Sequence, residues 1–384
     1  MKPKFAAAAA LIAFLVCTAS FLGQRSALAQ ELKIESECAV LLEPQSGEVL
    51  FEKAAHVRKA PASITKVMTL VLAMEAVNSG KVSVDDQVSA SENAWDLGGS
   101  EVYTEPGETF KLSDWLKAMV VGSANDAAVV VAEHVAGTED QFVKLMNEKA
   151  RSLGMKDTNF VNCHGLDHPD HYTTAYDVAL LSKYAVSVPG VLELTKIYHE
   201  KFREGKFDLY NPNKLLVFYP GCDGLKTGST SKAGYCVAAT AKRGNTRLIA
   251  VVMGAPSSQA RFNDATKLLN YGFANFTAVE FGSKQAQVAS VVVTKGAKTS
   301  VAVVASADLA LTVRKGEEGT VSVKYDLPQS IPAPVKKGQK VGQAILLKGK
   351  QEVKRVDLLA AEDVPQISLV GTFLKFLRKL ITWQ

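Results

Sequence analysis

The 384-residue sequence lacks a large excess of charge of either sign, and it contains few cysteines. It has 44 Lys and Arg against 39 Asp and Glu, a net charge of +5, and loss of residues 1–29 would lower this to +2 because that segment carries three cations and no acid. So small a charge does not predict binding to nucleic acid. After residue 29 the cysteines are Cys38, Cys163, Cys222 and Cys236. They permit three disulfide pairings or buried free thiols, and the sequence leaves these alternatives open.

The first thirty residues have the pattern of a targeting segment. Lys2 and Lys4 precede an apolar stretch over residues 5–22, and Ala27-Leu28-Ala29 forms a small-x-small cleavage site. This pattern predicts a signal peptide over residues 1–29 and export of the rest of the chain. The alternative is a retained N-terminal anchor.

The other end of the chain predicts an amphipathic helix over residues 363–384. Apolar residues recur at helical spacing, and Lys375, Arg378 and Lys379 fall outside the apolar face. Three cations in so short a segment argue against crossing a bilayer, so we expect a helix that lies in the headgroup plane and anchors the protein peripherally. The alternative is a helix that docks on its own domain. In either case the apolar face of the predicted helix consists of Val370, Phe373, Leu374, Leu377, Leu380 and Ile381.

Between the two terminal segments, the pattern of apolar residues changes once, after residue 281. Residues 30–281 alternate apolar runs of strand length with helical periodicity, which predicts an α/β (α+β) domain with a sheet covered by helices. Residues 282–362 have short Val- and Thr-rich runs separated by turn clusters and no helical periodicity, which predicts a small all-β sandwich. Helices are expected from Pro61 to Ser79 and over residues 112–121, 126–137 and 139–153, and paired strands over 235–241 and 248–253.

Ser63 and Lys66 are the first candidates for chemistry. They are three residues apart at the start of a predicted helix, so they lie on one face about one turn apart. A serine hydroxyl needs an adjacent base to act as a nucleophile, and a lysine can be that base if burial and nearby positive potential lower its pKa. The pattern is short, and Ser229-Thr-Ser-Lys232 matches it too, so by itself it is also consistent with a surface pair.

Two further strings supply the remaining groups. Ser123-Ala-Asn125 stands between two predicted helices, where the side chains could cap a helix or, in an active site, relay a proton and hold Lys66 and a substrate amide. Lys226-Thr-Gly228 begins a predicted strand, where a cation and a hydroxyl can bind a carboxylate and the glycine leaves room for a substrate backbone. The N–H groups of Ser63 and Ser229 would then form an oxyanion hole.

In this order, and with the longer runs around them, the three strings resemble the low-molecular-weight penicillin-binding proteins of the serine D-alanyl-D-alanine carboxypeptidase group. The resemblance extends to residues 61–69, 122–128, 146–155, 162–166, 174–177 and 223–228, and so over essentially the whole chain. It implies a penicillin-recognising, transpeptidase/β-lactamase-like fold and removal of the terminal D-alanine from peptidoglycan stem peptides, with β-lactams as covalent inhibitors. It implies no cofactor or metal, and a location on the outer side of the cytoplasmic membrane.

The resemblance also implies individual roles by position. Ser63 is the acylated nucleophile, Lys66 its base, and Ser123 a catalytic partner. The substrate-binding residues that it implies are Asn125, Lys226, Thr227, Gly228, Ser229, Arg261, which lies near the substrate carboxylate, and His164, on a loop bordering the cleft.

Three alternatives compete with this interpretation. A class A β-lactamase would carry a Glu-x-x-Leu-Asn segment for deacylation, which is missing after Asn125. A metallopeptidase is suggested by the cluster of His, Cys and Asp over residues 163–171, but the sequence has no His-Glu-x-x-His motif. A wall-binding protein without catalytic activity would not need the intact set of Ser63, Lys66 and Lys226.

Overall fold

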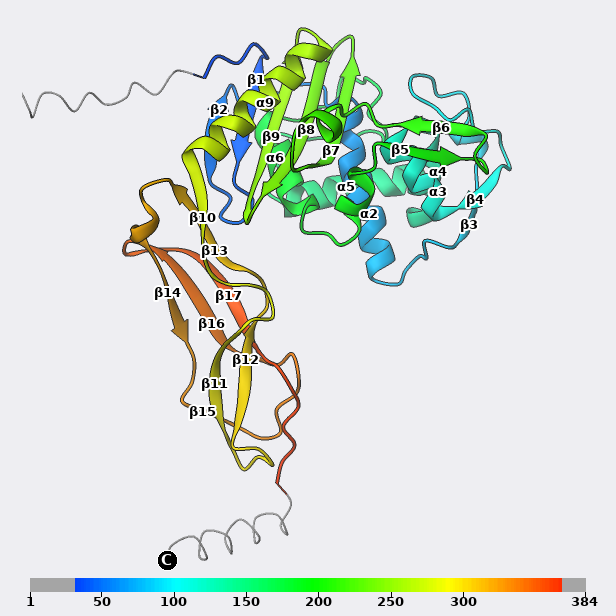
Figure 1. Ribbon diagram of the computed structural model, residues 1–384. Coiled ribbons are helices and arrows are strands. Elements are labelled where there is room, and N and C mark those ends of the chain that lie inside the picture. Colours follow the sequence, from blue (N-terminus) through cyan, green and yellow to red (C-terminus); the bar gives the residue numbers. More distant parts are fainter. Residues whose placement is uncertain (1–31, 368–384) are drawn as a thin grey trace, which may run out of the picture. The chain divides into compact units, whose positions relative to one another are not determined.

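The computed structural model describes residues 32–367 (Figure 1). The predicted signal peptide and residues 368–384 of the predicted C-terminal helix therefore lie outside the described residues. The helix expected from residue 363 is wrong for its first residues, because Val364 and Gln366 form β-bridges with Val335 and Gly296 and Val364 is buried in the second domain. No helix within residues 32–367 is long and apolar enough to cross a membrane.

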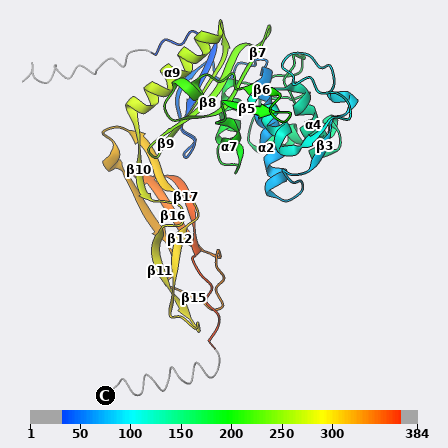
Figure 2. The ribbon, with the colours of Figure 1, turned by 45° about the vertical axis from the view of Figure 1, so that its right-hand side comes forward.

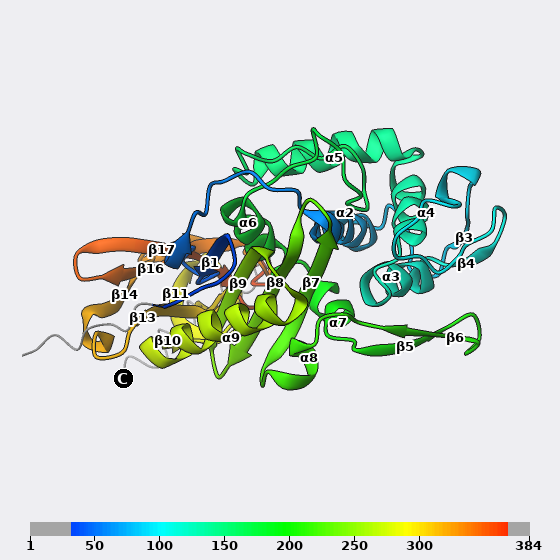
Figure 3. The same cartoon turned by 90° about the horizontal axis from the view of Figure 1, so that it is seen from above.

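A five-stranded antiparallel sheet forms the centre of the first domain, in the order β2-β1-β9-β8-β7. The strands β8 and β9 are almost continuously buried, because helices cover both faces of the sheet. Figure 3 shows α9 and α6 on opposite faces, and both helices contact β9. The strands are β1 (Cys38–Leu42), β2 (Val49–Lys53), β7 (Cys222–Thr230), β8 (Gly234–Arg243) and β9 (Thr246–Ala255); the two helices are α6 (Ala175–Ala185) and α9 (Ser258–Asn275).

A group of helices packs beside the free edge of this sheet, next to β7. The helix α2 is almost entirely buried, and it contacts α3, α4 and α5 as well as β7. It is preceded by the short 3-10 helix η1, which contacts β7 and β8. Their bounds are η1 (Ala62–Thr65), α2 (Lys66–Asn78), α3 (Leu112–Val121), α4 (Asn125–Ala136) and α5 (Glu139–Ser152).

Smaller elements complete the first domain. Two hairpins, β3–β4 and β5–β6, form separate two-stranded sheets. The bounds are β3 (Gln87–Ser89), η2 (Glu92–Ala94), β4 (Thr109–Lys111), α7 (Val191–Thr195), β5 (His199–Phe202), β6 (Phe207–Tyr210) and α8 (Leu215–Phe218).

The second domain is all-β. Figures 1 and 2 show its strands, which form a six-stranded sheet of order β14-β16-β17-β12-β11-β15 and the two-stranded β10–β13 sheet. The two sheets share one apolar core, to which Leu311 of β13 and Leu346 of β16 contribute. The strands are β10 (Phe276–Gly282), β11 (Gln287–Thr294), β12 (Ser300–Ala305), β13 (Leu309–Arg314), β14 (Val321–Asp326), β15 (Ser330–Pro332), β16 (Lys340–Lys348) and β17 (Gln351–Ala360), with η3 at Glu318–Thr320.

The predicted helices and strands of the first domain are present, with ends that differ by at most two residues when η1 and α2 are taken together. The fold-class prediction is confirmed for the two domains. The domain boundary expected after residue 281 falls within β10, and because β10 pairs with β13, residues 276–281 belong structurally with the second domain. The four described cysteines are free thiols, so none of the three possible pairings is formed.

Candidate active site

The three sequence strings, which lie far apart along the chain, meet where η1, the α3–α4 junction and β7 come together. Ser63 lies in η1, Ser123 in the turn between α3 and α4, and Lys226 in β7. The link is direct: Lys66 Nζ donates to Ser63 Oγ at 3.0 Å and to Asn125 Oδ1 at 2.6 Å. Lys226 Nζ donates to Ser123 Oγ at 2.8 Å. The structure thus joins the three strings through two lysine side chains.

Lys66 is buried in this site, with 1% of the residue exposed. Burial lowers the pKa of Lys66 to about 7, because a charged ammonium is poorly solvated there, while Cys163 and Asp126 act in the opposite direction. The amine has a third partner, the main-chain carbonyl of His164 at 2.7 Å. Lys66 is therefore held in one position, 3.0 Å from the Ser63 hydroxyl, and can exist as a neutral amine near neutral pH.

Lys226 is a second buried cation, with 3% of the residue exposed. Burial lowers the pKa of Lys226 well below its usual value, and the positive potentials of Lys66 and Arg261 add to the effect. Lys226 and Arg261 together favour the binding of an anion in this buried site, because a carboxylate would pair with them.

The backbone on both sides of the site adopts uncommon conformations. Ala62, directly before Ser63, has φ 48°, and Ser123 has φ 61°. Residues other than glycine seldom occupy this region, and such strain is concentrated at functional sites. Gly228 brings β7 against η1, since a Cβ on Gly228 would lie 2.9 Å from the Ser63 nitrogen. The main chain of β7 therefore lies directly against that of η1 beside Ser63.

The remaining predicted binding residues border the same site. Arg261 of α9 is 6% exposed, and its Nη1 donates to the carbonyls of Gly228 at 3.1 Å and Cys236 at 3.3 Å. Its Nε is buried without a partner in the part of the chain that the structure describes. Thr227 follows Lys226 on β7 and is buried.

The His164 loop contributes a main-chain group rather than an imidazole. Burial, followed by the charges of Lys66 and His171, lowers the pKa of His164 to about 3, so the ring is neutral at physiological pH. Its Nδ1 accepts a hydrogen bond from the Leu166 N–H at 3.2 Å. What reaches the site is the carbonyl that accepts from Lys66.

Two acidic residues that the sequence did not single out hold the surroundings in place. Glu139 begins α5, and its Oε1 accepts from the Cys163 N–H at 3.0 Å, next to the His164 carbonyl. Asp126 in α4 accepts from the N–H groups of Val102 and Thr104 at 3.0 Å each, which ties the 97–104 loop to the helix. The sequence signal for both residues was an acid in the first turn of a predicted helix. Such an acid is usually explained by its favourable interaction with the helix dipole, so it did not indicate a role at the site.

The cluster that suggested a metallopeptidase does not form a ligand set. Within residues 32–367, no three His, Cys, Asp or Glu side chains are grouped as metal ligands. His171 instead forms a hydrogen bond of 2.8 Å between its Nε2 and Thr65 Oγ1, and its Nδ1 accepts from the Val161 N–H.

The contact between the His164 loop and η1 gives a testable prediction. A Cβ on Gly165, which has φ +99°, would lie 1.9 Å from the Ala62 carbonyl oxygen, next to Ser63. Gly165→Ala is therefore expected to displace Ser63 and to slow acylation of the protein by a β-lactam at least about 100-fold. The matched control is Gly154→Ala: Gly154 has φ +79° but no atom within 4 Å of the added carbon, so this variant bears only the backbone strain. Equal acylation rates in the two variants would contradict the prediction.

Comparison with known proteins places these features in a family. The family model described as D-alanyl-D-alanine carboxypeptidase matches residues 25–257, and the model of the penicillin-binding protein 5 C-terminal domain matches residues 276–366. The D-alanyl-D-alanine carboxypeptidase DacF of Bacillus subtilis is 39% identical over 360 residues, which cover 93% of this chain and 92% of DacF.

Solved structures agree with these matches. Penicillin-binding protein 5 of Haemophilus influenzae covers 87% of this chain and 98% of its own, with 32% identity and a TM-score of 0.68. Penicillin-binding protein D2 of Listeria monocytogenes, solved in its ampicillin-bound form, covers 63% of this chain and 99% of its own, with 35% identity and a TM-score of 0.58.

Proposed function

This chain belongs to the D-alanyl-D-alanine carboxypeptidase family, and from that membership we propose which of its residues carry the reaction. The protein is a serine-type D-Ala-D-Ala carboxypeptidase of peptidoglycan metabolism, a penicillin-binding protein that acts outside the cytoplasm. The observation that carries the assignment of residues is the buried amine of Lys66, 3.0 Å from the hydroxyl of Ser63.

Ser63 is the nucleophile and Lys66 is its general base. In its neutral form Lys66 takes the hydroxyl proton while Ser63 Oγ attacks the carbonyl carbon of the penultimate D-alanine. The hydrogen bonds from Lys66 Nζ to Asn125 Oδ1 and to the His164 carbonyl keep the amine directed at the serine. The bond to the terminal D-alanine then breaks, and an ester on Ser63 remains.

The leaving amine needs a proton, and Ser123 relays to it the proton that Lys66 took from Ser63. The Ser123 Oγ accepts a hydrogen bond from Lys226 Nζ, which orients this hydroxyl. The N–H groups of Ser63 and Ser229 stabilise the oxyanion, while Lys226, Thr227 and Arg261 bind the terminal carboxylate of the substrate. Water then hydrolyses the ester and regenerates Ser63.

A β-lactam enters the same pathway at Ser63 but leaves it slowly. The chain has no Glu-x-x-Leu-Asn segment of the kind that supplies the deacylating glutamate in class A β-lactamases. We therefore expect the penicilloyl ester to persist on Ser63.

The test of the function is mass spectrometry of a defined pentapeptide ending in D-Ala-D-Ala. The protein is expected to release a single alanine, and the rate should be unchanged by a chelator such as EDTA because no step uses a metal ion. Release of a dipeptide, or loss of activity with EDTA, would contradict the mechanism.

We also propose that residues 367–384 anchor the protein peripherally to the outer face of the membrane, since Val364 and Gln366 pair with residues of the second domain. The support is the sequence pattern alone: an apolar helical face with Lys375, Arg378 and Lys379 outside it and Trp383 near the end. A protein ending at residue 366 is expected to remain in the supernatant with anionic lipid vesicles, whereas the full mature chain sediments with them. Equal sedimentation of both proteins would contradict the anchor.

A further inference from the structure

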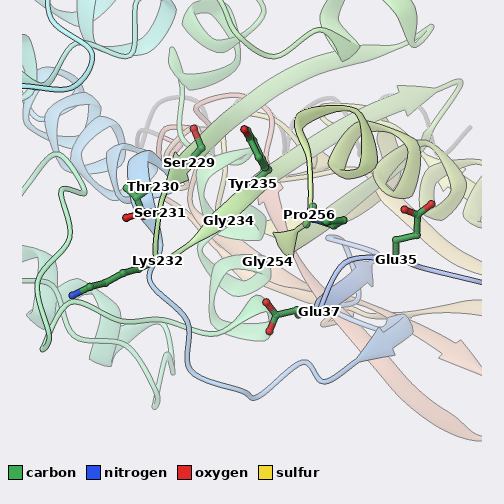
Figure 4. Close-up of a pocket in the computed structure, with 11 residues that line it drawn as sticks. Glu35, Glu37, Ser229, Thr230, Ser231, Lys232, Gly234, Tyr235, Gly254 and Pro256 are labelled. Atoms are coloured by element: carbon green, nitrogen blue, oxygen red, sulfur yellow. The ribbon is translucent and has the colours of Figure 1, made fainter.

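The active site is bordered by a strand and by an irregular loop. The strand is β7, and at its end a cavity of about 660 Å³ is lined by Ser229 and Tyr235 (Figure 4). The loop consists of residues 97–104, and it is bonded to Asn125. The position of Asn125 therefore depends on what holds this loop in place.

The 97–104 loop fixes the orientation of the Asn125 side chain. Asn125 Nδ2 donates to the Gly98 carbonyl at 2.7 Å, and the Asn125 backbone N–H donates to the Ser100 carbonyl at 2.7 Å. The other end of the same amide, Oδ1, accepts from Lys66 Nζ at 2.6 Å. Asn125 is 3% exposed, so an amide that turned away from the loop would leave a buried donor unpaired. The Gly98 carbonyl thus determines which end of the amide faces Lys66.

The loop itself is held by contacts with neighbouring elements. Residues 97–104 form neither helix nor strand. On one side, the Asp126 carboxylate accepts from the N–H groups of Val102 and Thr104. Tyr103, between them, has φ 57°, in the left-handed region. Such a conformation persists only where surrounding contacts enforce it, and the bonds from Asp126 to the two N–H groups are one part of these contacts.

Arg203, in the turn of the β5–β6 hairpin, binds the carbonyls of the same segment. Its Nη1 donates to the Val102 carbonyl at 2.5 Å, and its Nη2 donates to the Tyr103 carbonyl at 3.1 Å. Its Nε and Nη2 also donate to the two carboxylate oxygens of Glu108 at 2.7 Å each. One guanidinium group therefore ties the loop to the hairpin at three residues, in the forked geometry that only arginine provides.

The hairpin holds this guanidinium group in position. Arg203 has φ 51°, which residues other than glycine seldom adopt. Its Cζ lies 5.2 Å from the ring centre of Phe202 and 5.8 Å from that of Phe207. Phe202 is buried, and its ring centre lies 5.9 Å from that of Trp115 in α3. The hairpin is therefore anchored on α3, and Figure 1 shows it extending from the side of β7 toward β3 and β4.

We propose that Arg203 is a positioning residue of the active site, which acts on Lys66 through the 97–104 loop and Asn125. The inference rests on the proposed function, in which Lys66 is the general base. Arg203 keeps the loop against Asn125 Nδ2, and Asn125 Oδ1 then stays directed at the amine. Without the guanidinium group the loop keeps its bonds to Asp126 but loses those at its carbonyls, and the Asn125 amide is free to turn.

Acylation by a fluorescent penicillin, followed by quenched labelling, tests this role. Arg203→Gln is expected to lower the acylation rate constant at saturating penicillin about tenfold, because a small displacement of a catalytic group slows a reaction strongly. Arg203→Lys keeps the charge but not the fork, so it should recover only part of the rate. The matched control is Lys201→Met in the same hairpin: Lys201 pairs with Asp208, and its loss should leave the rate unchanged.

A second substitution at Asn125 distinguishes positioning from general damage to the fold. Asn125→Ala alone should slow acylation about 100-fold. If Arg203 acts through Asn125, adding Arg203→Gln to Asn125→Ala should slow acylation by less than about twofold more, because the two changes remove the same contact to Lys66. The same comparison with Arg203→Lys applies if Arg203→Gln does not fold.

The outcomes separate this inference from the function on which it rests. An unchanged rate in Arg203→Gln, together with slow acylation in Asn125→Ala, would overturn the inference and leave the proposed function intact. Equal slowing by Arg203→Gln with and without Asn125→Ala would also overturn it, because the effect would not pass through Asn125. Unchanged acylation in both Asn125→Ala and Lys66→Met would overturn the proposed roles in the reaction, and the inference with them.

Discussion

Ser63→Ala is expected to lower kcat/KM for D-alanine release by at least about 10,000-fold and to abolish covalent labelling by a fluorescent penicillin. The hydroxyl of Ser63 is the only oxygen that the mechanism uses to form the ester, so its loss removes the covalent step for both substrates. Both measurements use purified protein, with mass spectrometry of the pentapeptide for the first and gel fluorescence for the second.

The control for this prediction is Ser79→Ala, at the other end of α2, where the hydroxyl donates to the Ala76 carbonyl. That variant should keep both activities. Thermal unfolding of Ser63→Ala should resemble that of the unmodified protein, because Ser63 is only partly buried. Retained turnover or labelling in Ser63→Ala would reject Ser63 as the nucleophile, and the second Ser-x-x-Lys string at 229–232 would become the next candidate.

Spacing within one string was enough to predict the short contact between Ser63 and Lys66. Residues three apart at a helix start share a face, and the structure places Lys66 Nζ 3.0 Å from Ser63 Oγ. The contact between Lys226 and Ser123 could not follow from spacing, since 103 residues separate them. The resemblance implied that both residues line one cleft, but it did not specify this contact.

The sequence did not predict which main-chain groups reach the site or which side chains hold those groups in position. Lys66 donates to the carbonyl of His164, and every residue type has a carbonyl, so no side chain signals this role. The sequence drew attention to the imidazole instead, whose ring is neutral and bonded within its own loop. Glu139 was missed for a related reason: its contact with the Cys163 N–H depends on how α5 packs against the loop.

The register of the β7–β8 hairpin decides whether Cys222 and Cys236, one on each side of the Lys226-Thr-Gly228 string, could form a disulfide. Cys236 lies opposite Gly228, whereas Cys222 lies opposite Ala241, five residues further along β8. Five residues of strand span about 17 Å, too far for a disulfide. Register comes from the packing of both sheet faces, which single-sequence patterns do not specify.

The pH dependence of acylation should follow the proton on Lys66. Because burial lowers the pKa of Lys66 to about 7, the neutral amine that acts as base becomes scarce below that pH. The rate of acylation by penicillin is expected to rise about tenfold per pH unit from pH 5 to near pH 7 and to level off above it. Lys66→Met should be roughly 1,000-fold slower, with a flat profile over the same range, as measured by stopped-flow or quenched labelling.

The other titrating groups near Lys66 would not produce a rise in the acylation rate between pH 5 and pH 7. Burial lowers the pKa of His164 to about 3 and that of His171 to about 4, so both rings are already neutral at pH 5. Burial raises the pKa of the Cys163 thiol well above its usual value, so it stays protonated. A profile in Lys66→Met that still rises through pH 7 would therefore assign the base to another group, with Lys226 as the remaining buried amine. A flat profile in the unmodified protein would mean that Lys66 does not change protonation in the rate-limiting step.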